Sequence, residues 1–65
     1  MAYISLTFEG VKDAEQVNRL TTALMMVDGV DSAEVGRHGA DIEGRVRREA
    51  LVAAVQRLKL GIEVR

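Results

Sequence analysis

Two different spacings of apolar residues alternate along this chain. In residues 3–9 apolar and polar side chains alternate one by one, which is the period of a half-buried strand. The inward positions of this strand are Ile4, Leu6 and Phe8. From residue 13 to residue 27 the apolar residues are instead three and four apart, which predicts one buried face of a helix. That face consists of Val17, Leu20, Leu24 and Val27.

Two polar residues stand at the start of this expected helix. Asp13 is followed three residues later by Gln16, the spacing of a capping box, in which the two side chains accept hydrogen bonds from free backbone N–H groups. We therefore expect Asp13 to be the N-cap. Gly29 is placed to end the helix, because glycine readily adopts a left-handed backbone conformation.

The second half of the chain repeats the same order of periods. It predicts two antiparallel strands joined by a turn at residues 37–39, then a helix ended by Gly61, then a short strand. The expected ranges are 30–36 and 39–46 for the two strands, 47–60 for the helix and 62–65 for the last strand. The order β-α-β-β-α-β is typical of the α+β ferredoxin-like fold, a four-stranded antiparallel sheet with two helices on one face.

Composition narrows the range of functions. A chain of 65 residues makes one domain, residues 1–65, and zero cysteines exclude thiolate metal sites, disulfides and cysteine nucleophiles. A net charge of −1 and a single outward aromatic residue, Tyr3, argue against nucleic-acid binding. There is no run of about 20 apolar residues and no signal-peptide pattern, so we expect no membrane insertion and a cytoplasmic protein. No pattern of nucleophile and base indicates an enzyme.

Charge is unevenly distributed along the chain. Residues 1–34 hold six acids and two bases, whereas residues 35–65 hold seven bases and four acids. Either the two sets attract each other within the fold, or they form a docking surface for a protein partner. Arg45, Arg47 and Arg48 gather at the start of the second expected helix and are the candidates for docking or anion binding. Since the two helices run antiparallel, an acidic end and a basic end are expected.

The segment Gly10-Val11-Lys12-Asp13-Ala14-Glu15-Gln16 resembles the metal loop of heavy-metal-associated domains, the family of copper chaperones and mercury-binding proteins. Residues 24–35, 40–44 and 51–61 resemble that family's later elements, so the resemblance covers nearly the whole chain. Asp13 and Gln16 stand at the positions that the resemblance assigns to the family's two cysteines. Soft ions such as Cu(I) prefer sulfur ligands, so these oxygen donors do not replace that site. The resemblance implies a link to metal homeostasis, with a metal transporter or another metal-handling protein as partner.

Three other residues are candidate ligands outside this loop. His38, in the expected turn, could bind a borderline divalent ion together with Asp41. Met25 offers a thioether, but its neighbour Met26 points about 100° away on a helix, so the pair does not share one ion easily. The simpler interpretation is a solvated histidine, one methionine filling the core and the other half-exposed. We expect no cofactor.

These observations leave three hypotheses for the function. The leading one is a non-catalytic module without the cysteine pair that docks to a protein of metal homeostasis, as a monomer or with weak self-association. The second is weak binding of a borderline divalent metal through non-thiolate ligands. The third is a small-molecule sensing domain of the same topology.

Overall fold

The elements follow one another in the predicted order β-α-β-β-α-β in the computed structural model, which describes residues 2–65. This result confirms the α+β ferredoxin-like fold. Neither of the two helices in the described range is long and apolar enough to cross a membrane. The elements are β1 (Ala2–Glu9), α1 (Ala14–Met25), β2 (Val30–Val35), β3 (Gly39–Gly44), α2 (Arg48–Arg57) and β4 (Glu63–Val64).

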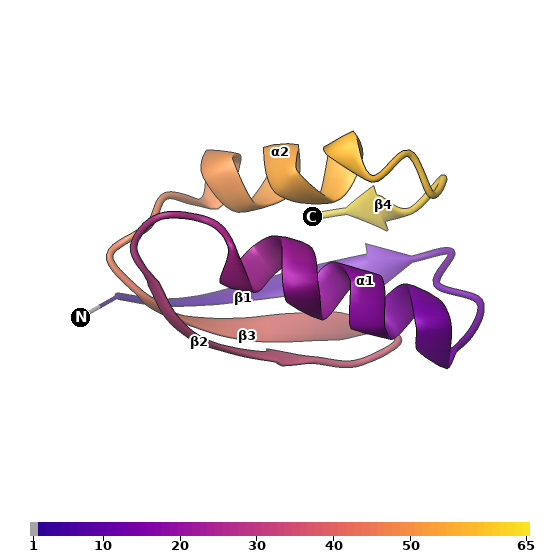
Figure 1. The fold of residues 1–65 in the computed structure, drawn as a ribbon, viewed down its shortest axis with the longest axis horizontal. Coiled ribbons are helices and arrows are strands. Elements are labelled where there is room, and N and C mark those ends of the chain that lie inside the picture. Colours follow the sequence, from indigo (N-terminus) through magenta and orange to yellow (C-terminus); the bar gives the residue numbers. More distant parts are fainter. Residues whose placement is uncertain (1) are drawn as a thin grey trace.

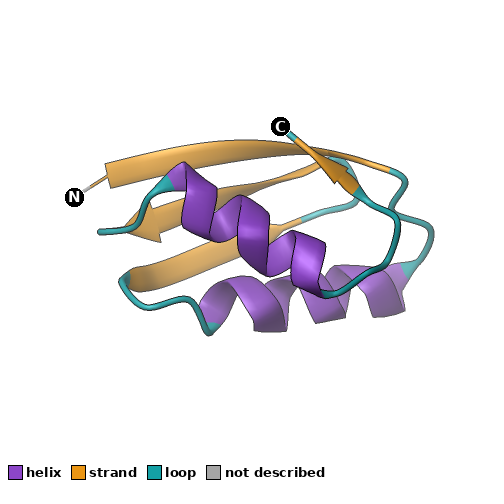
Figure 2. Cartoon of the chain, turned by 90° about the horizontal axis from the view of Figure 1, so that it is seen from above, coloured by secondary structure: helices purple, strands orange, loops and turns teal. Residues whose placement is uncertain are grey.

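The strands form one antiparallel sheet in the order β2-β3-β1-β4. The pairing of β1 with β3 is long, from Ala2 opposite Gly44 to Thr7 opposite Gly39. The pairing of β1 with β4 is short and includes only Phe8 and Glu9 as strand residues. Figures 1 and 2 show that both helices cover the same face of the sheet, which leaves the other face open to solvent.

The core lies between that sheet and the two helices. Its fully buried side chains belong to the two helices and to the inward positions of β3. The burial of each of them contributes about 1.5–3 kcal/mol to the free energy of unfolding. The inward positions of the first strand, Leu6 and Phe8, are buried as predicted. The largest of the fully buried residues are Leu20, Leu24, Ile42 and Leu51.

Both helices end earlier than predicted. The first ends at Met25 with Met26 as C-cap, and the second ends at Arg57 with Leu58 as C-cap. Lys59, with φ of 54°, takes a left-handed conformation directly after the C-cap of α2, and Gly61, with φ of 73°, does so two residues later. Lysine is an unfavourable choice there because its Cβ crowds the backbone at positive φ.

The third strand also ends early, at Gly44 rather than at residue 46. Gly44 has φ of 148°, and a Cβ built on it would lie 2.1 Å from the carbonyl oxygen of Gly29. The neighbouring Arg45 N–H donates a hydrogen bond of 2.8 Å to that same oxygen. The loop after α1 therefore crosses the end of β3 at backbone contact. We call Gly29, Gly44 and Arg45 the glycine crossing.

Candidate functional site: the loop between β1 and α1

The loop from Gly10 to Asp13 turns the chain from the central strand into the first helix. Gly10 has φ of 97°, and a Cβ built on it would lie 3.2 Å from the carbonyl oxygen of Gly61 in the loop before β4. Val11 is buried and anchors the loop on the core. Asp13 then has extended backbone, with φ of −152° and ψ of 176°, as an N-cap residue does. The loop is thus held in place at three points.

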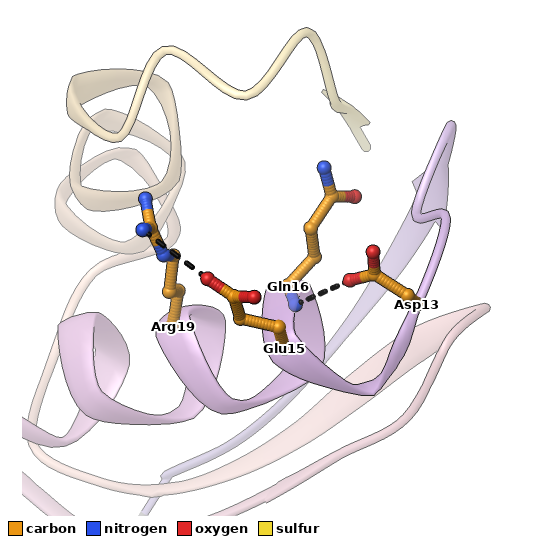
Figure 3. Close-up of polar contacts among 4 residues, drawn as sticks. All are labelled: Asp13, Glu15, Gln16 and Arg19. Carbon is orange, nitrogen blue, oxygen red and sulfur yellow. Dashed lines mark hydrogen bonds and ion pairs between the residues drawn. The ribbon is translucent and has the colours of Figure 1, made fainter.

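Asp13 and Gln16 close this loop onto the helix with two hydrogen bonds. The Gln16 N–H donates to Asp13 Oδ1 over 2.9 Å, the contact drawn in Figure 3. The Lys12 N–H donates to Gln16 Oε1, also over 2.9 Å. These bonds confirm Asp13 as the N-cap, and they differ from the usual capping box only in that the glutamine reaches the residue before the cap. Both side chains are therefore occupied in satisfying free N–H groups.

The neighbouring charged pair adds little to the loop. Glu15 and Arg19 lie on the outer face of α1, with Arg19 Nη2 3.4 Å from Glu15 Oε1 (Figure 3). Both side chains are more than half exposed, so solvent screens the attraction and the pair contributes at most a few tenths of a kcal/mol. The loop and the first turn therefore offer a polar, oxygen-rich surface with no sulfur ligand.

The other candidate ligands do not converge on one point. His38 lies exposed in the turn between β2 and β3, and its carbonyl accepts a hydrogen bond from Phe8 N–H. Asp41 lies on the open sheet face and accepts a bond of 2.9 Å from Ser5 Oγ. Within residues 2–65 no three side chains of the His, Cys, Asp or Glu type are grouped as a metal site would require. A borderline metal at His38 and Asp41 stays a prediction without a built site.

The expectation that one methionine fills the core is wrong, whereas the expectation that the other is half-exposed fits Met25. Met25 is 45% exposed and Met26 is 78% exposed, because α1 ends at this point and the chain turns away from the core. Met26 and Leu58 lie in the shallow groove between the helices, which the small side chains of Ala23, Ala53 and Ala54 leave open.

The three candidate arginines have different surroundings. Arg48 reaches back to the sheet, where its Nη2 donates a bond of 2.9 Å to the carbonyl oxygen of Ser5. Arg47 is the N-cap of α2, and in the described part of the chain its side chain makes no capping bond. Arg45 belongs to the glycine crossing through its backbone. All three side chains are exposed, so docking or anion binding there stays a proposal.

The two helix starts lie at opposite ends of the sheet, as predicted, but charge does not separate between these ends (Figure 1). Asp28 precedes the glycine crossing and therefore lies at the arginine end. At the loop end, Lys12 and the turn residue Arg37 accompany Asp13. This mixing was not predictable from the helix segments alone, because it arises from turns that belong to other parts of the chain.

Carboxylates gather instead on the open face of the sheet. On the open sheet face, Asp41 raises the pKa of the Tyr3 hydroxyl above its usual value, helped by some loss of hydration and then by Glu34 and Glu43. These four residues are outward positions of neighbouring strands, with Tyr3 opposite Glu43 and Glu34 opposite Asp41. The alternation of the strands predicts their exposure, but only the register brings them together. We call Tyr3, Glu34, Asp41 and Glu43 the acidic face.

Solved structures of other proteins share the fold of this chain. No protein-family model matches the chain, and no curated protein matches it significantly. Among solved structures, a copper-binding domain of the P-type ATPase HMA7 superposes with a TM-score of 0.88 at 27% identity, covering 100% of this chain and 92% of that one. The N-terminal domain of PacS from Synechocystis gives a TM-score of 0.86 at 27% identity, covering 100% and 96%. The chain has the architecture of a heavy-metal-associated domain, and its lack of cysteine fits a degenerate one.

The chain keeps the family's architecture along its whole length while lacking every cysteine. The CopZ metallochaperone, at 22% identity, has the same fold with a TM-score of 0.86, covering 98% of this chain and 100% of that one. The resemblance of the Gly10–Gln16 segment places Asp13 and Gln16 where the family has its cysteines. In this chain those positions form the capping network of the loop.

Removing the cap tests this structural role. Asp13→Ala should lower the free energy of unfolding by about 0.5–2 kcal/mol, because the Gln16 N–H in the first turn loses its acceptor. Thermal or urea unfolding measures the loss. Asp13→Ser keeps an acceptor oxygen and should retain most of the stability, while Glu15→Ala, in the same exposed turn, should change it by less than about 0.5 kcal/mol. Equal stability of Asp13→Ala and the wild type would show that Asp13 does not act as a cap.

Proposed function

We propose that this degenerate heavy-metal-associated domain is a non-catalytic module of metal homeostasis that docks to a metal-handling protein without carrying a soft metal ion itself. The observation behind the proposal is the capping network of Asp13 and Gln16. It fills the positions that the resemblance assigns to the cysteine pair, and it uses their oxygen atoms for hydrogen bonds. Hard carboxylate and amide oxygens are poor ligands for Cu(I) or Hg(II).

Two further facts support a docking role. The domain has kept a complete core and a loop fixed by Gly10, Val11 and the cap, so its surface near the loop is rigid and preorganised. The similar structures include a copper-binding domain of a P-type ATPase and a metallochaperone, which are proteins of metal handling by their own names. A rigid surface of this kind that carries no metal ion is suited to compete for the contacts between metal-handling proteins, or to modulate them.

The first test is a metal titration followed by amide NMR. Cu(I), added under reducing conditions, should leave the amide signals of Asp13 to Gln16 unmoved and should remain with a competing chelator. Zn(II) should behave in the same way at this loop. Stoichiometric shifts at these residues, with an affinity near that of a thiolate pair, would contradict the cargo-free role.

The second test is docking to a cysteine-containing heavy-metal-associated domain, for example one from a copper ATPase, in its apo and Cu(I)-loaded states. Titration into the labelled domain should give chemical shift changes on one surface that weaken with salt, since exposed charges orient such encounters. The variant with Arg45, Arg47 and Arg48 all replaced by serine tests the arginine end. Docking is wrong if the wild type shows no shift changes with either state at any salt concentration.

A further inference from the structure

The open face of the sheet, on the side away from both helices, has a regular pattern of polar side chains (Figures 1 and 2). Residues that pair between antiparallel strands point to the same face, so the outward side chains form two rows that cross β2, β3 and β1. One row is Glu34, Asp41 and Ser5, and the other is Ser32, Glu43 and Tyr3. The rows are about 7 Å apart along the strands, since a strand rises about 3.4 Å per residue.

The charge of these rows is not compensated by cations of the described residues 2–65. The ion pairs in this range join Arg19 to Glu15 and Arg65 to Glu9, and neither includes a carboxylate of the acidic face. The raised pKa of the Tyr3 hydroxyl agrees with the negative potential that results. The acidic face therefore presents three carboxylates that attract positive charge from outside the fold.

The placement of these carboxylates is unfavourable for the sheet itself. Glu34 lies directly opposite Asp41 on the neighbouring strand, and like charges at such positions destabilise a sheet. Aspartate and glutamate are also poor strand formers. Residues that break a local rule without an internal compensation are typical of functional sites. The cost to the fold therefore points to a role for these charges in binding.

The spacing of the carboxylates selects the kind of ligand. In the part of the chain that the structure describes, no three side chains of the His, Cys, Asp or Glu type lie close enough together to hold a metal ion. Asp41 accepts a hydrogen bond of 2.9 Å from Ser5 Oγ, and Glu43 accepts one of 3.4 Å from Ser32 Oγ, so a serine orients each carboxylate. A matching ligand carries several positive charges about 7 Å apart, and every second side chain of an extended polypeptide has this spacing.

We propose that the acidic face binds an extended basic segment of a partner protein, with arginine or lysine at every second residue. Two successive basic side chains pair with Asp41 and Glu43, and the Tyr3 ring, which is 67% exposed, offers a cation–π contact beside them. Arginine suits both contacts, because its planar guanidinium pairs with carboxylates and stacks on aromatic rings. The face shares no residue with the β1–α1 loop, so the inference does not rest on the proposed function.

The probe is a blocked peptide, acetyl-Arg-Thr-Arg-Thr-Arg-amide, titrated into the labelled full chain at low salt. Tyr3 is the only tyrosine and the chain has no tryptophan, so tyrosine fluorescence reports on this face alone. Binding should change that fluorescence and shift the amide signals of Glu34, Asp41 and Glu43.

Two control ligands separate charge from spacing. The same peptide with glutamine in place of each arginine should not bind, because it carries no charge. Spermidine, a small polycation without side chains, should bind at least about threefold more weakly than the arginine peptide. Equal binding of spermidine would show that the face only collects counter-ions, and would overturn the proposal.

Paired variants then test the residues. Glu34→Gln with Asp41→Asn should weaken peptide binding by roughly three- to thirtyfold at low salt, and by less at high salt. The same variant should melt roughly 1–6 °C higher without peptide, because a like-charge pair is gone, whereas a purely structural role would lower its melting temperature. Glu15→Gln with Asp28→Asn removes the same charge from exposed positions outside this face and should leave binding nearly unchanged. Tyr3→Ser should weaken binding, and Tyr3→Phe should retain it.

Three results would overturn the proposal. The first is wild-type affinity in the variant of Glu34 and Asp41, and the second is a set of shift changes confined to the helices. The third is self-association of the wild type at low salt that shifts the signals of the acidic face, excludes the peptide and is lost when Arg45, Arg47 and Arg48 are replaced by serine. The occupant would then be a second copy of this chain.

Discussion

The variant in which both Asp13→Cys and Gln16→Cys are made is expected to bind one Cu(I) ion tightly under reducing conditions, while the wild type binds none at this loop. The reason is that the loop already has the geometry of a helix N-terminus with two side chains that converge on it. Asp13 Oδ1 accepts from the backbone N–H of Gln16 and Gln16 Oε1 accepts from the backbone N–H of Lys12, both over 2.9 Å, so both side chains lie at the junction of the loop with the first turn. Two thiolates are the donors that Cu(I) prefers.

The helix itself favours this new site. The free N–H groups and the dipole at the start of α1 stabilise negative charge and lower the pKa of a thiol placed there. Without metal, the double variant should be less stable than the wild type by about 0.5–2 kcal/mol, since its cap is gone. Metal should then restore stability, because an ion that binds only the folded state stabilises it in proportion to its affinity.

Competition with a Cu(I) chelator and thermal melts with and without metal measure these effects. The matched control carries Glu15→Cys and Asn18→Cys, which have the same spacing on the exposed side of α1 but lie within the helix rather than at its junction with the loop. It should bind Cu(I) more weakly than the loop pair. If the two pairs bind alike, the loop has no special geometry and its likeness to a metal loop is superficial.

Gly44→Ala is expected to destabilise the domain by about 3 kcal/mol or more. The added Cβ would lie 2.1 Å from Gly29 O and 2.8 Å from Asp31 N, both of them backbone atoms that do not move independently. The φ of 148° adds backbone strain for any residue with a Cβ. For a domain of this size the melting temperature should fall by roughly 10–25 °C.

Gly61→Ala is the matched control for this substitution. Gly61 also has positive φ, 73°, but a Cβ there would meet no atom within 4 Å. Its cost should be limited to backbone strain, about 1 kcal/mol. Thermal and urea unfolding of the two variants separate strain from collision. Similar losses in both would show that the glycine crossing relaxes and that close approach is unimportant.

The order and type of the elements were predictable from the sequence, because the spacing of apolar residues indicates which face of each element is buried. The boundaries were harder. Glycines were expected to end the helices, yet α1 ends four residues before Gly29, which belongs to the glycine crossing. The helix α2 ends before Lys59, which takes a left-handed conformation ahead of Gly61. Gly44 was expected within a strand, and its role depends on a contact with a loop fifteen residues earlier in the chain.

The candidate site shows the same limit. The cap was predictable, because Asp13 and Gln16 are local in sequence and their spacing has a direct physical meaning. The bond between Arg48 and Ser5 joins residues 43 apart, and nothing in either local pattern indicates it. The acidic face depends on the register of three strands, which side-chain alternation alone does not fix. Local chemistry was therefore foreseeable, whereas contacts between distant residues needed the structure.

Because β4 has only two residues, it has a consequence for the local unfolding of the domain. A strand of two residues, held to β1 by a few backbone bonds, can detach while the remaining three strands and both helices stay packed. Such a partial opening would expose β1 along its full length for brief periods. β1 would then become an edge strand of the remaining sheet, so a strand of the sheet's interior takes part in the region that opens first.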